Sequence, residues 1–378
     1  MKPHDGMRLG LGRQSHSAQD GPEVLLPGEG PERISWQDPG QVPDWDQLVL
    51  EVSGANSFYS ANWARVMKES YGYQPMYLTT FQGERMTGCL PLMEVQVLGR
   101  GRRAVSLPFT DEIVPLATGP EEAAHLMRHA LELGQQRGWR ILEVRGGGNL
   151  PVEGNDTQGA ASFLGHRIDL RASTETLFQG LDGSIRRGIR LAERNGVQVE
   201  FSTLTEGMRS YYSLHCLTRK RHGLPPQPWS FFATIHKHMM SCGQGFVALA
   251  RHGGQVVAGA VFLTFGRSAI YKYGASDFVH QHLRPNNLVM WESIRKLVGQ
   301  QIRDLNLGRT SLSNEGLRRF KQAWGSSEYL MKYLRFDYGK GVFVPVKDGA
   351  HGWHNAVFRR VPTFLLRLTG SLFYRYCG

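Results

Sequence analysis

The chain has 378 residues, of which 41% are hydrophobic, and its formal net charge is +11. This length is enough for two domains with sizeable cores, and this composition excludes a disordered chain. The excess of Lys and Arg favours anionic partners such as nucleic acid, coenzyme A, phosphorylated carriers or an anionic membrane surface. Charge alone does not choose among them, because a basic protein without such a partner has the same balance.

The four cysteines are neither in CxxC pairs nor at the spacing of zinc ligands; they are Cys89, Cys216, Cys242 and Cys377. This predicts reduced thiols in the cytoplasm and no metal site. The N-terminus lacks the apolar core of a signal peptide, and no run of 18 uncharged apolar residues predicts a membrane-spanning helix.

The first part of the chain predicts a leader followed by an α/β unit. Residues 1–40 are rich in Gly, Pro and polar residues, which predicts a flexible leader. Residues 41–168 predict a unit in the order helix, hairpin, strand, helix, strand. Its expected elements are a helix capped by Ser60, strands 76–81, 86–95 and 105–109, a helix over 121–137 and a strand over 140–144. Pro91 inside a hairpin strand predicts an edge or a bulge.

Residues 169–340 repeat this element order and predict a second unit. The expected elements are strand 197–201, helices 205–221 and 231–240, strands 246–251, 256–265 and 268–274, helix 288–301 and strand 303–307. Residues 308–314 predict a polar loop, the following helix ends at Gly325, and residues 328–336 predict a strand.

That last helix carries the most suggestive pattern in the chain. Lys321 lies between Phe320 and Trp324 on a short helix between two strands. A lysine placed in this way can be aimed at an acyl carbonyl or a phosphate. The alternative is that Lys321 is an exposed charge and that the two aromatic residues are ordinary core.

Four segments resemble one known family. They are Phe320-Lys321 with Trp324-Gly325 and the preceding loop, and the stretches SFYSANW (57–63), RRGIRLAE (186–193) and YKYGAS (271–276). In this order they resemble the FemAB-like branch of the GNAT superfamily, which includes peptidoglycan-bridge aminoacyltransferases and BioF2-like acetyltransferase-domain proteins of exopolysaccharide systems. The resemblance implies an α/β fold of two tandem GNAT-like units with mixed central sheets.

The resemblance also implies roles for single residues. Lys321 is expected to contact the acyl or aminoacyl donor and to stabilise the oxyanion, with Phe320 lining the same pocket. Asp111, after a first-unit strand, is expected to accept the proton of the attacking group. Arg221 is expected against the phosphates of the acceptor, and Arg309 as a further substrate contact.

Tyr271 and Tyr273 alternate with Lys272 on a predicted strand, so we expect both hydroxyls on one face, where they could bind the acceptor. The alternative is two half-buried strand tyrosines with solvated tips.

The chain departs from the family in two places. The family often has an acid before the Gly-Arg of the loop, where this chain has Asn306-Leu307-Gly308-Arg309, and the Gly-rich turn that presents N–H groups to coenzyme A pyrophosphate is missing. Acyl-coenzyme A and aminoacyl-tRNA therefore both stay open as donor substrates. No tightly bound cofactor is expected, and no cofactor-binding residue is assigned.

Residues 341–378 form a basic C-terminal tail. Residues 354–376 place apolar residues on one helical stripe and arginines on the other side, which predicts an amphipathic helix. Such a helix either lies in the interface of an anionic membrane or docks on the protein's own core.

These features favour a FemAB-like acyl or aminoacyl transferase. It would act on an amine or hydroxyl of an anionic, carrier-linked sugar or peptide precursor of a surface polymer, at the inner face of the cytoplasmic membrane. The alternative is a non-catalytic GNAT-fold scaffold that binds an anionic glycan carrier. Apart from tRNA as a donor, nucleic acid is not expected, because only the net charge suggests it.

Overall fold

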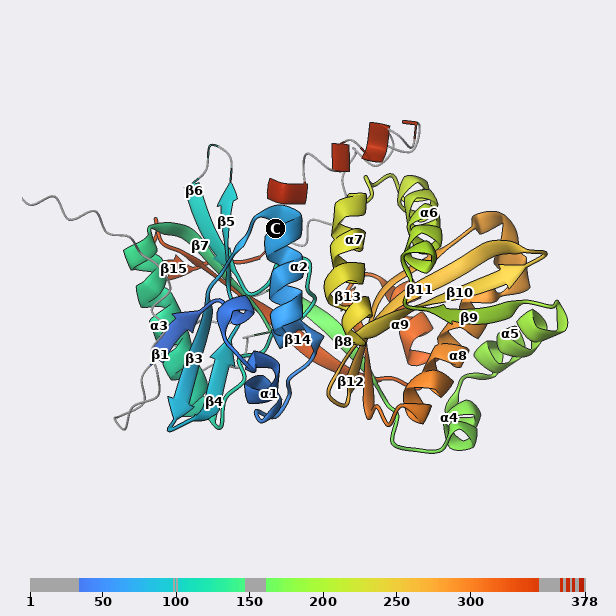
Figure 1. Cartoon of the computed structure of the whole chain (residues 1–378), viewed down its shortest axis with the longest axis horizontal. Helices are drawn as coiled ribbons and strands as arrows, with labels where there is room; N and C mark the ends of the chain where they lie inside the picture. The colour runs from blue at the N-terminus through green and yellow to red at the C-terminus, as the bar shows by residue number, and fades with distance from the viewer. Residues whose placement is uncertain are drawn as a thin grey trace, which may run out of the picture.

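The computed structural model describes residues 34–97, 99, 101–146, 161–346, 361–362, 365–367, 369–370 and 374–376. Figure 1 shows two α/β units side by side, with α2 (Ala61–Tyr71) of the first unit next to α7 (Trp229–His238) of the second at the centre. Among the described helices, none is long and apolar enough to cross a membrane.

The first unit begins earlier than predicted, because the last residues assigned to the leader form a strand and a short 3-10 helix. Its elements are β1 Ile34–Gln37, η1 Pro39–Gln41, α1 Trp45–Leu50, η2 Ser57–Tyr59, α2 Ala61–Tyr71, β2 Gln74–Pro75, β3 Tyr77–Gln82, β4 Arg85–Leu90, β5 Met93–Val97, β6 Gly101–Val105, α3 Pro120–Arg137 and β7 Trp139–Arg145. Ser60 caps α2 as expected, since its side chain accepts a hydrogen bond from the Trp63 N–H. The strand interrupted by Pro91 splits into β4 and β5, which join different sheets.

The second unit follows the predicted order. Its elements are β8 Ala161–Asp169, α4 Thr174–Gly180, α5 Gly183–Arg194, β9 Gln198–Ser202, α6 Thr205–Arg221, α7 Trp229–His238, η4 Met240–Cys242, β10 Gly245–His252, β11 Gln255–Phe265, β12 Ser268–Ser276, η5 Phe278–Leu283, α8 Pro285–Gly299, β13 Asp304–Ser311, α9 Glu315–Gln322, β14 Ser327–Asp337 and β15 Val342–Phe343. The element order confirms two α/β units of similar plan, each with a parallel strand pair, β6 with β7 and β12 with β13.

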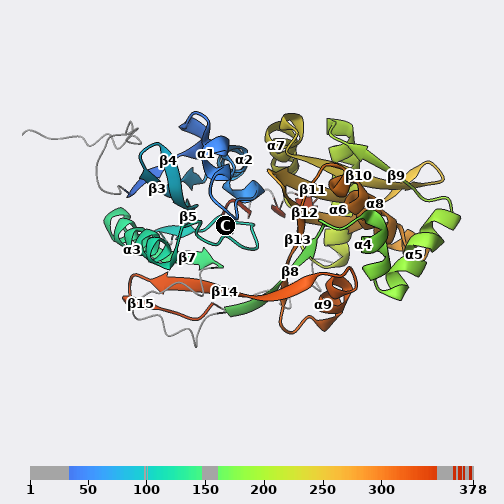
Figure 2. The same cartoon turned by 90° about the horizontal axis from the view of Figure 1, so that it is seen from below.

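Within the described residues, one mixed sheet of 12 strands runs through both units, beside a separate three-stranded sheet of β1, β3 and β4. Its order is β2-β5-β6-β7-β14-β8-β13-β12-β11-β10-β9, with β15 paired to β14. Strand β14 therefore lies between β7 of the first unit and β8, and Figure 2 shows it running along the molecule from one unit to the other. The division expected at residues 168 and 169 does not separate two independent sheets.

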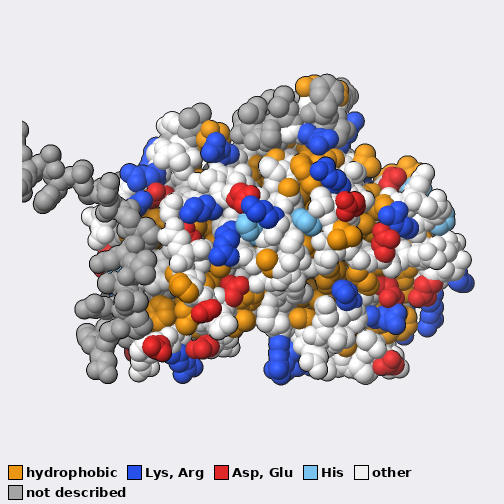
Figure 3. Space-filling model, viewed as in Figure 1, with side chains coloured by type: hydrophobic (Ala, Val, Ile, Leu, Met, Phe, Trp, Pro, Cys, Tyr) orange, Lys and Arg blue, Asp and Glu red, His pale blue; other side chains and the backbone are white. Residues whose placement is uncertain are grey.

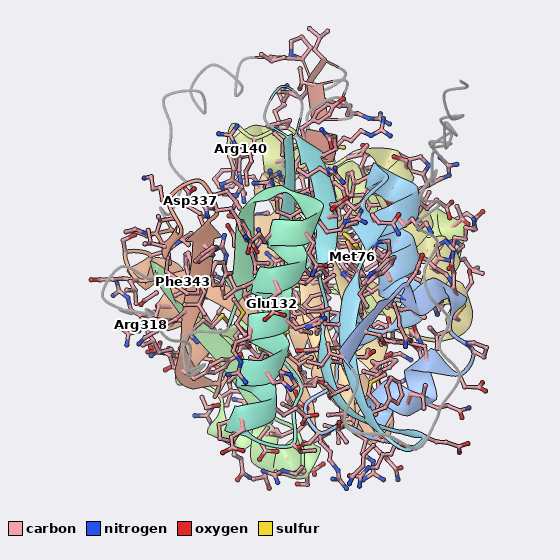
Figure 4. The ribbon with its side chains drawn as sticks, turned by 90° about the vertical axis from the view of Figure 1, so that its left-hand side faces the viewer. Met76, Glu132, Arg140, Arg318, Asp337 and Phe343 are labelled. Atoms are coloured by element: carbon pink, nitrogen blue, oxygen red, sulfur yellow. The ribbon has the colours of Figure 1, made fainter. Side chains whose placement is uncertain are left out.

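The cores are continuous as well. The largest apolar cluster joins α2 of the first unit to α6 and α7 of the second, and the rings of Trp63 and Tyr71 contact Phe231 across the boundary. A second cluster lies under α5 and α8 on the opposite face of the second unit's strands, and a third under α3. Figure 4 shows α3 in front of the first unit's sheet, with Glu132 on this helix and Arg140, Asp337 and Phe343 on neighbouring strands.

Two predicted strands have the wrong bounds, and both errors fall near the site. Residues 106–109 leave the sheet after β6, because Leu107 and Phe109 adopt left-handed backbone conformations that a strand does not accommodate. Strand β13 continues to Ser311 through residues expected to form a loop, since a bulge between Asn306 and Arg309 absorbs the extra residues.

Most of the predicted C-terminal helix lies outside the described residues. Leu366 is buried, and the Arg367 guanidinium lies 5.2 Å from the ring centre of Tyr212. The Tyr374 hydroxyl accepts a hydrogen bond from Arg219 (2.7 Å), and its backbone carbonyl accepts one from the Tyr73 hydroxyl (3.0 Å). The described part of the tail thus packs on both units of its own chain.

Candidate functional site

The parallel strands β12 and β13 separate at their carboxyl ends. They pair only from Ser268 to Ile270 on β12, after which β12 is bonded to β11 and β13 to β8. Ligands of open α/β sheets bind at the carboxyl ends of parallel strands, where neighbouring strands part. The equivalent position in the first unit is closed, because the Arg145 N–H donates to the Ser106 hydroxyl and the Ser106 N–H to the Glu143 carbonyl.

A cavity of about 230 Å³ lies at this opening, at the start of α8. It brings together three predicted site residues from distant parts of the chain, Tyr271, Arg221 and Phe320. Its other polar walls come from the end of α6, the end of β12, η5 and the start of α8; they are Thr218, His222, Ser276, Gln281 and Asn286. The guanidinium of Arg221 lies 5.3 Å from the ring centre of Phe278 at the rim.

The two strand tyrosines do not share a face, so that prediction is wrong. Tyr271 pairs with Phe262 and Tyr273 with Val261, which leaves Lys272 as the extra residue of a bulge. Tyr271 consequently packs on the α8 side of the sheet, whereas Tyr273 packs on the α7 side together with Lys272. The hydroxyl of Tyr273 is buried without a hydrogen-bond partner among the described residues.

Lys321 is buried rather than solvated, since only 5% of it is exposed. Its ammonium group donates to the carbonyls of Gly308 and Arg309, both at 2.9 Å, which fixes α9 to the bulge of β13. An ammonium has three N–H donors, so one remains for a ligand. Burial lowers the pKa of Lys321 to about 8, the nearby Asp111 carboxylate raises it, and Arg309 lowers it.

Asp111 belongs to a loop, residues 106–113, that crosses from the first unit to the second. Its carboxylate lies 3.7 Å from the Arg309 guanidinium and directly against Gly308, where an added Cβ would sit 2.4 Å from the carboxylate oxygen. Asp111 reaches the bulge of β13 from one face of the sheet, while Lys321 reaches it from α9 on the other. The structure therefore brings three residues with separately predicted roles, Asp111, Arg309 and Lys321, together around one backbone position.

Side chains from three strands hold the carbonyls of this loop. The Arg145 guanidinium donates to the carbonyls of Leu107 (3.3 Å) and Thr110 (3.1 Å). The Tyr333 hydroxyl donates to the Asp111 carbonyl, and the Lys272 ammonium donates to the Phe109 carbonyl. Left-handed non-glycine residues cost about 1–3 kcal/mol each and persist where the surroundings impose them, often at functional sites. Loop 106–113 contains two such residues, Leu107 and Phe109, as is typical of a functional site.

A row of arginines continues from the loop across the first unit, and the sequence alone did not indicate it. The buried Glu143 carboxylate accepts hydrogen bonds from Arg335 (2.5 Å) and Arg145 (2.9 Å). Arg103 on the next strand faces the same group, and its Nε is buried without a partner among the described residues. Arg309 lies 5.5 Å from the Tyr333 ring centre and continues the row on the same face of the sheet. The row thus contains four guanidiniums. The buried Glu143 carboxylate lies among the first three, and Asp111 lies at the end beside Arg309. Alternating charges on separate strands carry no local motif, so only the sheet order reveals the row.

Surface charge elsewhere is mixed. Figure 3 shows Lys and Arg interspersed with Asp and Glu over the face that Figure 1 presents. Within the described ranges, no three His, Cys, Asp or Glu side chains lie close enough together to hold a metal ion.

Part of the chain matches the model of a known protein family. Residues 182–322, from α5 to the end of α9, match the family model described as an acetyltransferase (GNAT) domain. This range contains both strands of the open pair, the cavity residues and Lys321. No curated protein sequence matches the chain.

Solved structures share the fold over most of the chain. FemX superposes with a TM-score of 0.64 at 13% identity, covering 79% of this chain and 96% of FemX. The C-terminal domain of a putative lysylphosphatidylglycerol synthetase from Agrobacterium fabrum gives 0.52 at 15% identity, covering 77% and 90%. L-PGS from Bacillus licheniformis gives 0.50 at 12% identity, covering 88% and 98%. The family model and the shared fold confirm the predicted resemblance to the FemAB-like branch of the GNAT superfamily at the level of the fold.

Proposed function

We propose that the protein is an acyl or aminoacyl transferase whose donor enters the cavity at the carboxyl ends of β12 and β13. The observation that carries this proposal is the open strand pair with a cavity that Phe320 lines, together with the buried Lys321, which follows Phe320 on α9. The Lys321 ammonium is fixed at two of its three donors and still carries a positive charge at neutral pH.

The reaction needs few groups. An amine or hydroxyl of the acceptor attacks the carbonyl of a thioester or ester, and the thiol or alcohol of the donor leaves. Transfer is accelerated by holding both partners in line and by stabilising the oxyanion. Lys321 would supply the positive charge for the oxyanion, and Asp111 would accept the proton that the attacking group loses.

The donor is best sought among acyl-coenzyme A esters and aminoacyl-tRNA. The cavity lies at the N-terminus of α8, and helix N-termini favour anionic groups such as pyrophosphate. Arg221 and the neutral polar side chains around it would add hydrogen bonds. The Gly-rich turn of many coenzyme A sites is absent, so the polar side chains of the cavity would have to replace its backbone contacts.

The acceptor is proposed to be an anionic, carrier-linked sugar or peptide precursor of a surface polymer, met at the inner face of the cytoplasmic membrane. The arginine row that ends at Arg309 and Asp111 supports an anionic acceptor, because four guanidiniums are opposed by two carboxylates. One of the fold neighbours is the C-terminal domain of a putative lysylphosphatidylglycerol synthetase, and the proposal of an anionic acceptor follows this similarity.

A donor screen by thermal shift tests the proposal. Acetyl-coenzyme A, longer acyl-coenzyme A esters and charged tRNA are each mixed with the full chain, and a donor that binds the native state raises the melting temperature. We expect one donor class to give a shift that Phe320→Ala weakens, because this ring lines the cavity. Leu330→Ala, an exposed apolar residue on β14, is the matched control and should leave the shift unchanged.

Product detection by mass spectrometry completes the test. Transfer that is unchanged in folded Lys321→Ala would remove the proposed role of the lysine. A shift with an anionic glycan carrier but with no donor, and no product, would favour the scaffold hypothesis instead.

A further inference from the structure

Lys272 lies at the boundary of the two units in an aromatic cage. Its ammonium is 4.9 Å from the ring centre of Phe58, 5.5 Å from that of Trp63 and 5.2 Å from that of Tyr273. Phe58 and Trp63 belong to η2 and α2 of the first unit, whereas Lys272 and Tyr273 belong to β12 of the second. Each such contact contributes about 0.5–2 kcal/mol where the cation is desolvated.

Lys272 lies on the α2 side of the sheet, opposite Tyr271, because side chains alternate along a strand, and the bulge keeps Tyr273 on this same side. From the α2 side its ammonium reaches the carbonyl of Phe109, one of the two left-handed residues in loop 106–113. Two residues after Phe109 in the same loop, Asp111 lies against Gly308 and Arg309.

We propose that Lys272 is a positioning residue that ties loop 106–113 to the second unit and thereby sets the place of Asp111 in the candidate site. The two units contribute the two halves of this site, and the contact of Lys272 with the loop joins the bonds from Arg145 and Tyr333 in holding Asp111 towards the bulge of β13. The chemical consequence rests on the proposed function, whereas the tie itself does not.

The surrounding charges are consistent with this role. Burial lowers the pKa of Lys272 to about 8; the Asp111 carboxylate raises it, and Arg145 and Arg309 lower it further. A charged group in an apolar cage is costly to desolvate. Methionine, which is close to lysine in length, removes that cost together with the donor. Lys272→Met should therefore keep the overall stability while it releases the loop, which distinguishes a positioning residue from one that only stabilises the fold.

Hydrogen exchange of the full chain, read by mass spectrometry, tests the tie. The amides of Thr110 and Ile113 donate to the carbonyls of Leu107 and Arg145 and report on loop closure. In Lys272→Met we expect at least tenfold faster exchange in peptides covering 106–113, with an unchanged or raised melting temperature. Unchanged exchange in this loop, or an equal rise throughout the chain, would overturn the proposal.

Lys296→Met is the matched control. The Lys296 ammonium lies 5.0 Å and 5.4 Å from the ring centres of Phe201 and Phe246, far from the loop, so exchange in 106–113 should stay as in the unaltered protein. If Lys272→Met does not fold, Phe58→Leu removes one ring of the cage and should raise exchange in the same loop by a smaller factor. No rise in that variant would count equally against the tie.

Transfer assays then separate this inference from the proposed function. With a working donor and acceptor, Lys272→Met should lower kcat at least tenfold and leave the KM for the donor unchanged, because neither Lys272 nor any residue of loop 106–113 lines the donor cavity. If no pair of substrates ever reacts, the proposed function fails, and the exchange data still decide the role of Lys272.

Discussion

Gly308 is the residue on which the two halves of the candidate site converge. It has a left-handed φ of +73°, and an added Cβ would overlap the Asp111 carboxylate. We expect Gly308→Ala to lower the free energy of unfolding by about 1–3 kcal/mol, from backbone strain and from displacement of Asp111. Urea unfolding measures this change.

Gly254 provides the comparison for that prediction. It has a similar φ of +78° in the turn between β10 and β11, but an added Cβ would meet nothing within 4 Å. Gly254→Ala should therefore show the backbone cost alone. Equal losses in the two variants would show that Asp111 moves aside without cost.

The lowered pKa of Lys321 predicts how the free energy of unfolding depends on pH. Its pKa of about 8 in the folded protein is below the value of about 10.4 in an unfolded chain, so the unfolded state binds more protons between these values. The free energy of unfolding should therefore rise as the pH increases from about 8 to about 10, by about 1–3 kcal/mol for this group. Urea unfolding at several pH values should show a smaller rise in Lys321→Met.

Lys340, which is exposed, is the control for that titration, and its replacement by Met should leave the pH dependence unaltered. If Lys321 has the proposed catalytic role, transfer follows the opposite course. The rate should fall as the pH rises through about 8, because the positive charge is lost. A rate that keeps rising above pH 9 would contradict a charged Lys321.

At the scale of elements, the packing of α9 over β8 buries a histidine. His166 is fully buried beside Lys321, and neither ring nitrogen has a hydrogen-bond partner among the described residues. Burial and the Lys321 charge lower its pKa to about 4. A buried polar atom without a partner costs about 1–3 kcal/mol, so His166→Leu should raise the free energy of unfolding by about 1–2 kcal/mol in chemical denaturation.

His215 on α6 gives the opposite expectation in the same assay. It is also buried, but its Nε2 is bonded to the Gln227 side chain at 2.8 Å. His215→Leu should be destabilising, because Gln227 would lose its partner. If His166→Leu instead loses as much stability as His215→Leu, an ordered water or a ligand occupies the space beside His166.

The elements themselves were largely predictable, and the errors have a common cause. Hydrophobic periodicity and capping residues such as Ser60 are local signals, so the helices and most strands are close to their expected bounds. The bulges in β12 and β13 depend on how these strands pair with their neighbours in the sheet. Strand pairing cannot be predicted from a short stretch of sequence. The candidate roles of Lys321 and Asp111 came from the family resemblance, whereas the orientation of Tyr273 and the contacts of Lys272 could not be predicted.

At the scale of the molecule, β14 predicts cooperative unfolding. It pairs with β7 and with β8, and the largest core cluster spans both units. Scanning calorimetry should show one transition. Leu334→Ala, next to β7, and Met331→Ala, next to β8, should each shift the whole transition to lower temperature, with a loss of about 2–5 kcal/mol. Two separate transitions in either variant would show that the units unfold independently.

The two-unit plan was predictable from the repeated order of elements, but the shared strand was not. Arg335 on β14 and Glu143 on β7 are 192 positions apart in the sequence, and a pairing at that separation leaves no trace in local pattern. The arginine row depends on the same long-range pairing, and for this reason it appeared only in the structure.

The position of β14 also constrains how the protein is made. Strand β7 leaves the ribosome long before β14, with which it pairs. At about 5–20 residues per second, the delay over the 192 residues between them is about 10–40 s. During this time the first unit presents an open sheet edge with unpaired backbone groups, which invites pairing with other nascent chains. The early half of the chain should accordingly depend on chaperones until synthesis has passed residue 337, and truncated chains that end before β14 should aggregate rather than accumulate as a folded first unit.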